Sequence, residues 1–240
     1  MIRLFFRNLD EAEKWLDVRM AETLDPHLLV RKNFFPFANK EQVKVLLRSI
    51  MENPQQLERI SKSSYAHSNG FDKMQLIKSK RYKLRMHIWW PGNKDKDEDI
   101  HSHAWSFGSY IITGNLNSIN YIEDINGEGY YKYYARKTDG KKAEGKKAFD
   151  LLSQGRSGLK SLLETTVNKE SWYVSSVENI HKVVRDCDIT TATFVLQGPT
   201  ELEYSRVFLQ EKPVQTEAIP VTLFSPNEVY EKLSKLIECM

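Results

Sequence analysis

From about residue 72 to residue 210 the chain is a succession of short segments rich in β-branched and aromatic residues. This pattern constrains the fold more than any other feature. Segments such as YKLRMHIWW, SYIITGNL and TATFVLQG have the composition and alternation of strands, in which neighbouring side chains point to opposite faces. Turn-forming pairs separate the segments: Pro91-Gly92, Asn126-Gly127, Asp139-Gly140 and Gly198-Pro199. Many short strands punctuated by turns predict a mainly β sandwich or barrel.

The two ends of the chain follow a helical period instead. DEAEKWLDVRMAETL places apolar residues among charges, at Trp15, Val18, Met20 and Leu24. We therefore expect a helical N-terminal extension over residues 1–71, packed on a β-barrel over residues 72–211. A C-terminal segment with a helix, SPNEVYEKLSKLIECM, is expected within residues 212–240.

Two asparagines mark the starts of further N-terminal helices. Asn39 can cap NKEQVKVLLRSIM, and Gln42 stands at the third helical position, as in a capping box. Asn53 precedes Pro54, which suits the first position of a helix.

A basic insertion interrupts the predicted barrel at about residues 127–165. Residues 132–149, KYYARKTDGKKAEGKKAF, hold seven Lys or Arg residues against two acids, and we interpret the second half as a mobile loop. The following DLLSQGRSGLKSLLETT is predicted to contain a short helix. Basic residues beside tyrosines also suit single-stranded nucleic acid. The net charge of only +3 favours a solvated hairpin, so nucleic acid is not the expected partner.

Composition sets broad limits on the kind of protein. With 240 residues, 40% of them hydrophobic and 28% charged, the chain can form one generous folded domain. Two distant cysteines, Cys187 and Cys239, do not form a secreted disulfide framework. The N-terminus lacks the apolar core of a signal peptide and no segment suits a membrane span, so we expect a cytoplasmic protein.

The segment IHSHAWSFGSYIITGNL raises the question of a metal site. On a strand, His101 and His103 would share a face with Trp105 and Phe107, and two adjacent imidazoles can chelate a divalent ion. His181, in the strand-like NIHKVVRD, is the third candidate ligand. The alternative is that the pair are ordinary surface or hydrogen-bonded histidines.

These residues resemble the cupin superfamily. Cupins carry a first motif of His-x-His, a following acid and a closing glycine, and a second motif with one histidine on a strand. His101, His103 and Gly114 match the first motif and His181 matches the second. The resemblance covers about residues 72–210 and implies a double-stranded β-helix, or jelly-roll barrel.

One departure from the cupin pattern is informative. The expected acid is absent, because its positions hold Phe107 and Gly108. The shell of three neutral histidines is similar to that of the cysteine dioxygenase, or thiol dioxygenase, type of cupin, in which they hold ferrous iron. That group has an active-site tyrosine, for which Tyr204 is the nearest candidate here.

The resemblance implies a metal-dependent oxidoreductase that oxidises a small thiol- or carboxylate-bearing molecule with dioxygen. Fe(II) is the expected metal; zinc, nickel and manganese remain possible. A redox-neutral isomerase or hydrolase, or a non-catalytic cupin that binds a ligand or partner, stays open. A homodimer is possible, and no membrane partner is expected.

The remaining candidate site residues surround this centre. In RYKLRMHIWW, Arg85 and His87 share one face, which is either a solvated outer face or the lining of the barrel. In the second case they, with Arg206 and Trp105, would bind substrate, an arginine holding a carboxylate or phosphate. His67, in YAHSNGFDK, belongs to an ordinary turn or serves as an acid/base group or fourth ligand.

Overall fold

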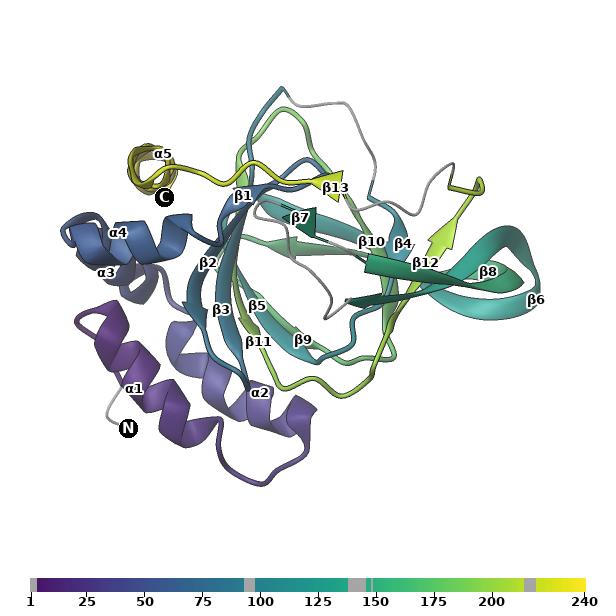
Figure 1. The fold of residues 1–240 in the computed structure, drawn as a ribbon, viewed down its shortest axis with the longest axis horizontal. Coiled ribbons are helices and arrows are strands. Elements are labelled where there is room, and N and C mark those ends of the chain that lie inside the picture. The colour runs from purple at the N-terminus through teal and green to yellow at the C-terminus, as the bar shows by residue number, and fades with distance from the viewer. Residues whose placement is uncertain (1–3, 93–97, 138–145, 148, 214–218) are drawn as a thin grey trace.

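The computed structural model describes residues 4–92, 98–137, 146–147, 149–213 and 219–240. Five α-helices and one short 3-10 helix lie at the two ends of this part of the chain (Figure 1). Their bounds are α1 (Leu9–Arg19), α2 (Pro26–Phe34), η1 (Phe35–Phe37), α3 (Lys40–Met51), α4 (Pro54–Ser61) and α5 (Pro226–Cys239). In the same residues, no helix is long and apolar enough to cross a membrane.

The strands of the described residues form two facing sheets and a small additional pair. Sheet A has the order β1-β2-β3-β11-β5-β9 and sheet B the order β10-β4-β12-β6-β8. Their bounds are β1 (Tyr65–Ala66), β2 (Asp72–Lys78), β3 (Lys83–Trp89), β4 (Ile100–His101), β5 (Phe107–Thr113), β6 (Asn115–Lys137), β7 (Lys146–Lys147), β8 (Phe149–Asn168), β9 (Trp172–Ser175), β10 (Ile180–Val184), β11 (Thr191–Gln197), β12 (Ser205–Leu209) and β13 (Ile219–Pro220).

The path of the chain through these sheets confirms the predicted jelly-roll barrel. From β3 onward the chain crosses between sheets, with β3, β5, β9 and β11 in sheet A and β4, β6, β10 and β12 in sheet B. All the pairings are antiparallel. This alternation is the double-stranded β-helix, which encloses an interior between its two sheets.

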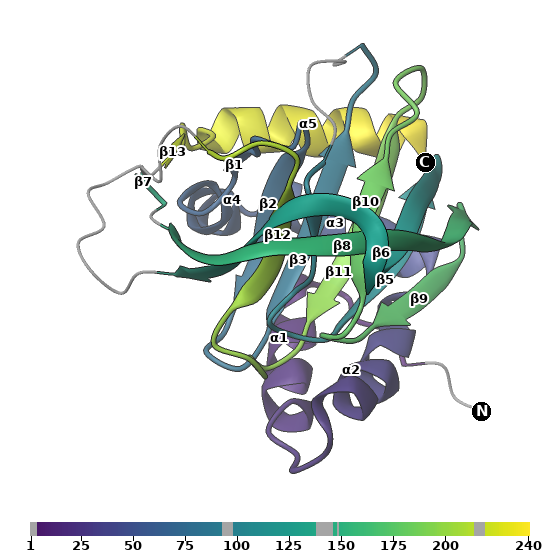
Figure 2. The same ribbon diagram turned by 90° about the vertical axis from the view of Figure 1, so that its right-hand side faces the viewer.

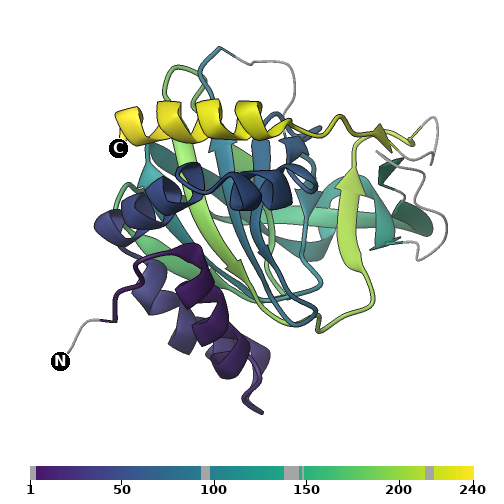
Figure 3. The ribbon, with the colours of Figure 1, turned by 60° about the vertical axis from the view of Figure 1, so that its left-hand side comes forward.

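The helices cover the outer face of sheet A (Figure 3). The apolar stripe of α3, from Val43 to Ile50, is buried there, and so are Val229, Leu233 and Leu236 of α5. The predicted face of α1 is partly wrong: Val18 is 70% exposed and Leu24 is 45% exposed. Leu9, Ala12 and Leu16 form the buried stripe together with the predicted Met20, because the true stripe follows spacings of three and four residues from Leu9.

The helix starts are as predicted except for one side chain. Asn39 accepts a hydrogen bond from the backbone N of Gln42, and Asn53 caps α4. The reciprocal half of the predicted capping box is wrong. The Gln42 amide instead exchanges two hydrogen bonds with the backbone of Phe6 and so fastens the N-terminal segment to α3.

The long hairpin of β6 and β8 corrects two predictions. Asn126-Gly127 is not a turn between strands; it lies within β6, where the register skips from Glu123 to Glu128 opposite the single residue Leu159. Residues 150–166, predicted to contain a short helix, lie within β8, because they pair with β6 along most of its length. In Figure 2 this pair of strands passes across the front of the molecule, at the end of sheet B. The predicted mobile loop falls largely on residues 138–145 and 148, outside the described residues.

Candidate metal centre

Three segments bring the predicted histidine ligands together. His101 ends β4, His103 lies in the link from β4 to β5, and His181 lies on β10, directly opposite His101 in the antiparallel register. The predicted single strand through the His-x-His motif is wrong. The chain leaves sheet B after His101 and enters sheet A at Phe107, so the motif stands where the chain crosses the barrel.

The three imidazoles are close enough to share one ion. Their ring centroids are 4.7 Å apart for His101 and His103, 4.9 Å for His101 and His181, and 5.2 Å for His103 and His181. One ring nitrogen from each lies within 4.8 Å of the other two. Nitrogen ligands at about 2.1 Å from one ion stand roughly 3–3.5 Å apart. Small rotations of the rings would therefore complete the shell, and the cluster could hold a divalent metal.

The environment of the rings suits metal binding. Nδ1 of His101 lies 2.8 Å from the backbone O of Asp99; a proton on Nδ1 makes this a hydrogen bond and leaves Nε2 as the ligand atom. Nδ1 of His181 is buried without a hydrogen-bond partner among the described residues. Burial, with the charge of His101 second, lowers the pKa of His181 to about 3. Neutral imidazole is the form that binds metals.

Phe107 occupies one of the two positions at which the cupin pattern has an acid. Its ring lies 5.0 Å from that of His103 and 6.4 Å from that of His181, so an acid at this position could have reached an ion held by the histidines. Gly108 faces the other way, where a Cβ atom would come within 2.6 Å of the Phe34 ring of α2. Burial holds the pKa of His103 well below its ordinary value, and the charges of His101 and His181 lower it further.

Arg85 lies inside the barrel, so the interpretation of its strand face as solvated is wrong. It is 6% exposed, and its guanidinium stands 5.6 Å from the ring centre of Trp105, which in turn contacts the ring of His103 at 5.6 Å. Within the described part of the chain, the guanidinium has no hydrogen bond or ion pair. Burial lowers the pKa of Arg85 to about 10, so it remains a cation at neutral pH.

His87 lies deeper along the same inner face. Its ring contacts those of Phe71 at 4.7 Å and Trp89 at 6.0 Å, and burial lowers its pKa well below the ordinary value. The neighbouring inner positions also carry polar groups. In the described residues, buried side-chain atoms without a hydrogen-bond partner include Nε2 of His87, Nε2 of Gln75 and Oε1 of Gln197.

His67 lies beside the centre and outside the group of three histidines that could hold a metal. Its ring stacks on Phe71 at 4.5 Å, and its Nδ1 accepts a hydrogen bond from the backbone N of Asn69. Burial, followed by the charges of Lys73, His101 and Arg85, lowers its pKa to about 3. Its predicted catalytic role stays a prediction.

The structure does not bring Tyr204 and Arg206 to the inner side of the histidines. Val207 stands opposite His101 in the register and shares its face, so Arg206 points to the outer side of sheet B. Tyr204 stacks on Tyr134, the residue opposite Arg206, with ring centroids 3.8 Å apart. The alternation of side chains along YSRVFL places Tyr204 and Arg206 on one face of the strand. Which face points inward is known only from the pairing of β12 with β4.

The inward tyrosine is Tyr173, which the sequence reasoning missed. It lies on β9 opposite Ser109, its ring contacts that of Phe107 at 6.0 Å, and burial raises its pKa to about 12. The available signal was the alternation in SWYVSS. Trp172 contacts Phe34 on the helix side and Val174 packs with the helix-side core, so Tyr173 must face inward.

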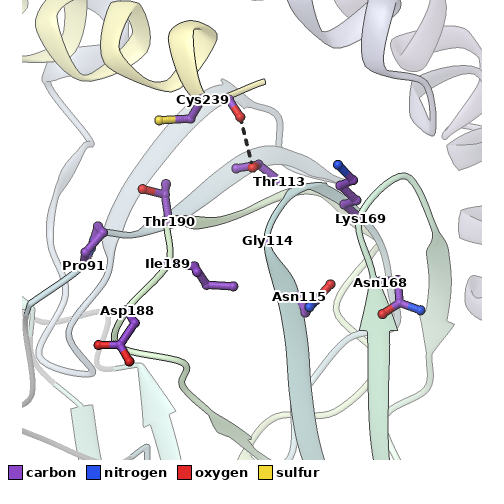
Figure 4. Close-up of a pocket in the computed structure, with 10 residues that line it drawn as sticks. All are labelled: Pro91, Thr113, Gly114, Asn115, Asn168, Lys169, Asp188, Ile189, Thr190 and Cys239. Carbon is purple, nitrogen blue, oxygen red and sulfur yellow. Dashed lines mark hydrogen bonds between the residues drawn. The ribbon is translucent and has the colours of Figure 1, made fainter.

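A surface hollow of about 710 Å³ lies away from the centre (Figure 4). It is lined by the turn from β5 to β6, the loop before β11 and the end of α5, where Thr113 Oγ1 donates to the backbone O of Cys239 at 3.2 Å. Gly114 in this turn has a φ of +68°, and a Cβ there would lie 2.4 Å from Thr191 Oγ1. The predicted closing glycine is thus required by the backbone.

Comparisons with known proteins find likeness at the level of architecture. No protein-family model matches the sequence, and no curated protein matches it significantly. Among solved structures, a cupin-family protein from Methanocaldococcus jannaschii is 7% identical, with a TM-score of 0.32 over 56% of this chain and 84% of that one. The hydroquinone 1,2-dioxygenase PnpCD is 8% identical, with a TM-score of 0.29 over 53% and 64%.

A DMSP lyase structure is 10% identical, with a TM-score of 0.30 over 55% of this chain. The chain spans about half, 49%, of that lyase. Scores this low carry no argument about activity. The strand order and the positions of the histidines, rather than these scores, make the molecule a jelly-roll barrel with a three-histidine cluster at its centre.

Proposed function

We propose that this protein is a non-haem iron dioxygenase acting on a small carboxylate-bearing molecule. The observation that carries the proposal is that three clustered histidines share the barrel interior with a buried arginine that has no anionic partner among the described residues. When bound, ferrous iron supplies the one-electron chemistry that reactions of dioxygen require.

The donor set supports an open metal site. His101, His103 and His181 are the three ligands, and Phe107 takes the place from which a fourth protein ligand would reach the ion. A shell with three protein ligands leaves positions for substrate and a second small molecule. The Phe107 ring also excludes water from one side of the cluster.

Arg85 supports an anionic substrate. A buried cation without an anionic partner is costly, and a carboxylate can satisfy the planar fork of a guanidinium with two hydrogen bonds. The cationic side chains Lys73 and Arg85 both lower the pKa of His103, so the interior carries positive charge that an anion would neutralise. Trp105, between Arg85 and His103, would flank the bound molecule.

Metal content tests the proposal directly. We expect about one equivalent of iron per chain in the purified wild type and its loss in His181→Ala. His27→Ala, a histidine on α2, is the matched control and should retain the metal. Iron-dependent oxygen consumption with small carboxylates, thiols included, would then identify the substrate.

Other outcomes of this experiment favour other functions. Zinc or nickel in place of iron, with turnover that needs no oxygen, would replace the dioxygenase by a hydrolase or isomerase. If neither the purified protein nor the protein supplied with iron binds metal, the enzyme proposal fails and a ligand- or partner-binding barrel remains.

A further inference from the structure

Arg206 contacts the His-x-His segment from its outer side. Ser102 stands between the two histidines, and its Oγ accepts hydrogen bonds from the backbone N of Arg206 at 3.1 Å and from Nε at 3.3 Å. The backbone N of Ser102 donates in return to the backbone O of Arg206 at 2.9 Å. The Arg206 backbone and side chain therefore fix the residue that joins two ligands.

The far end of the same guanidinium contacts the segment that carries the third ligand. Nη2 of Arg206 donates to the backbone O of Val177 at 3.2 Å and of Glu178 at 3.0 Å. These residues form the turn before β10, on which His181 lies. Carboxylates balance the charge: Glu178 Oε2 lies 3.4 Å from Nη2, and Glu123 Oε1 lies 3.7 Å from Nη1.

We propose that Arg206 is a positioning residue of the metal centre. It ties the segment of His101 and His103 to the segment of His181 and so sets the separation of the three rings without touching them. The inference rests on the proposed function, because it takes these histidines as the ligands. With only three protein ligands, a displaced ring is not compensated by a fourth.

The planar fork of arginine suits this task better than lysine does. One guanidinium reaches Ser102 through Nε and two backbone carbonyls through Nη2, in directions fixed by its plane. A lysine ammonium at the same place would make one point contact and leave either Ser102 or the turn unsupported.

The test is Co²⁺ binding by the full-length protein, followed by the visible absorption of the bound ion. Loss of a contact that orients ligands typically weakens metal affinity about 10- to 100-fold. We expect this loss in Arg206→Met, together with an altered cobalt spectrum, and only partial recovery in Arg206→Lys. Arg156→Met, which removes an arginine that contacts Gly129 and Tyr131 on the β6–β8 hairpin, is the matched control and should bind as the wild type does.

The outcomes separate this inference from the proposed function. If the wild type binds no Co²⁺ and no iron, the metal centre itself is wrong. If the wild type binds and Arg206→Met binds within twofold with an unchanged spectrum, the positioning role is overturned. If Arg206→Met does not fold, Ser102→Ala decides: weaker binding with an altered spectrum supports the role, and unchanged binding overturns it.

Discussion

The two faces of strands β3 and β11 are almost equally buried, but they differ in composition. The outer face, under the helices, is apolar and fully buried: Leu84, Met86, Ile88, Ala192, Phe194 and Leu196 are each 0% exposed. The inner face carries Arg85, His87, Thr193 and Gln197, three of which include buried atoms without hydrogen-bond partners among the described residues. Apolar burial stabilises a fold, whereas unpaired polar burial costs free energy. The outer face thus supports the fold, and the inner face is suited to binding.

The largest expected effect is on the outer face. Phe194→Ala removes a fully buried ring that stacks near Phe37 at 6.1 Å, and we expect it to lower the free energy of unfolding by about 3–5 kcal/mol. Urea denaturation measures this. Leu162→Ala, at a side chain 65% exposed, is the control and should change stability by less than about 0.5 kcal/mol.

A smaller loss is expected where α5 joins the edge of the same sheet. The buried carboxylate of Asp72 accepts hydrogen bonds from Trp90 Nε1 at 2.6 Å and from Lys232 Nζ at 2.7 Å. Asp72→Ala leaves both donors without this partner and should cost about 2–3 kcal/mol by thermal or urea unfolding. Lys232→Met should cost less, because Trp90 keeps its acceptor. Equal losses of stability in Asp72→Ala and Lys232→Met would mean that the ion pair between these two residues provides most of the stabilisation.

Around the histidine cluster, beside the inner face, the effect on stability depends on pH. His67 and His181 have folded-state pKa values of about 3, below the unfolded value near 6.5, so the unfolded chain binds more protons between these limits. Above about pH 6.5 the free energy of unfolding has its full value. As pH falls from there toward 3, each histidine lowers the free energy of unfolding by about 1.4 kcal/mol per pH unit. Urea titrations of the metal-free protein at several pH values measure the slope. His67→Gln should flatten it; an unchanged slope would remove His67 from the account.

The smallest expected change in stability is at Arg85. Removing a buried cation that has no anionic partner among the described residues should leave the free energy of unfolding within about 1 kcal/mol of wild type, or raise it. Arg85→Met should nevertheless raise the KM for a carboxylate substrate. The control is Arg81→Met, at an exposed arginine just before β3, and its KM should stay well below that of Arg85→Met. A large loss of stability with an unchanged KM would mean that Arg85 supports the fold and does not bind substrate, which contradicts the distinction between the two faces.

Local sequence patterns predicted the elements better than the site around the histidines. Alternation predicted most strands, and helix caps predicted the starts of α3 and α4, because these depend on neighbours in the chain. The three histidines were found from the His-x-His pair and from the match of His181 to the second motif of the resemblance, although the strand predicted through the pair was wrong. Tyr173 and the outward position of Arg206 were not found, since each depends on register with a distant strand.

The prediction of a short helix in the segment that forms β8 failed for a related reason. DLLSQGRSGLKSLLETT has no clear period of its own, and its conformation is decided by pairing with β6 along its full length. Interactions with a partner strand override the intrinsic preference of such a segment.

The position of β10 between β4 and β6 has a consequence for how the molecule assembles. His181 pairs with His101 and with Asn120, which are far earlier in the chain, whereas α3 and α4 are neighbours in sequence and in space. Closing long loops delays the pairing of distant strands during folding. The helical layer should therefore gain protection from hydrogen exchange first, and the strand that completes the histidine cluster should be among the last to be protected. The three histidines of the cluster would then come together only at the end of folding, after the barrel has closed.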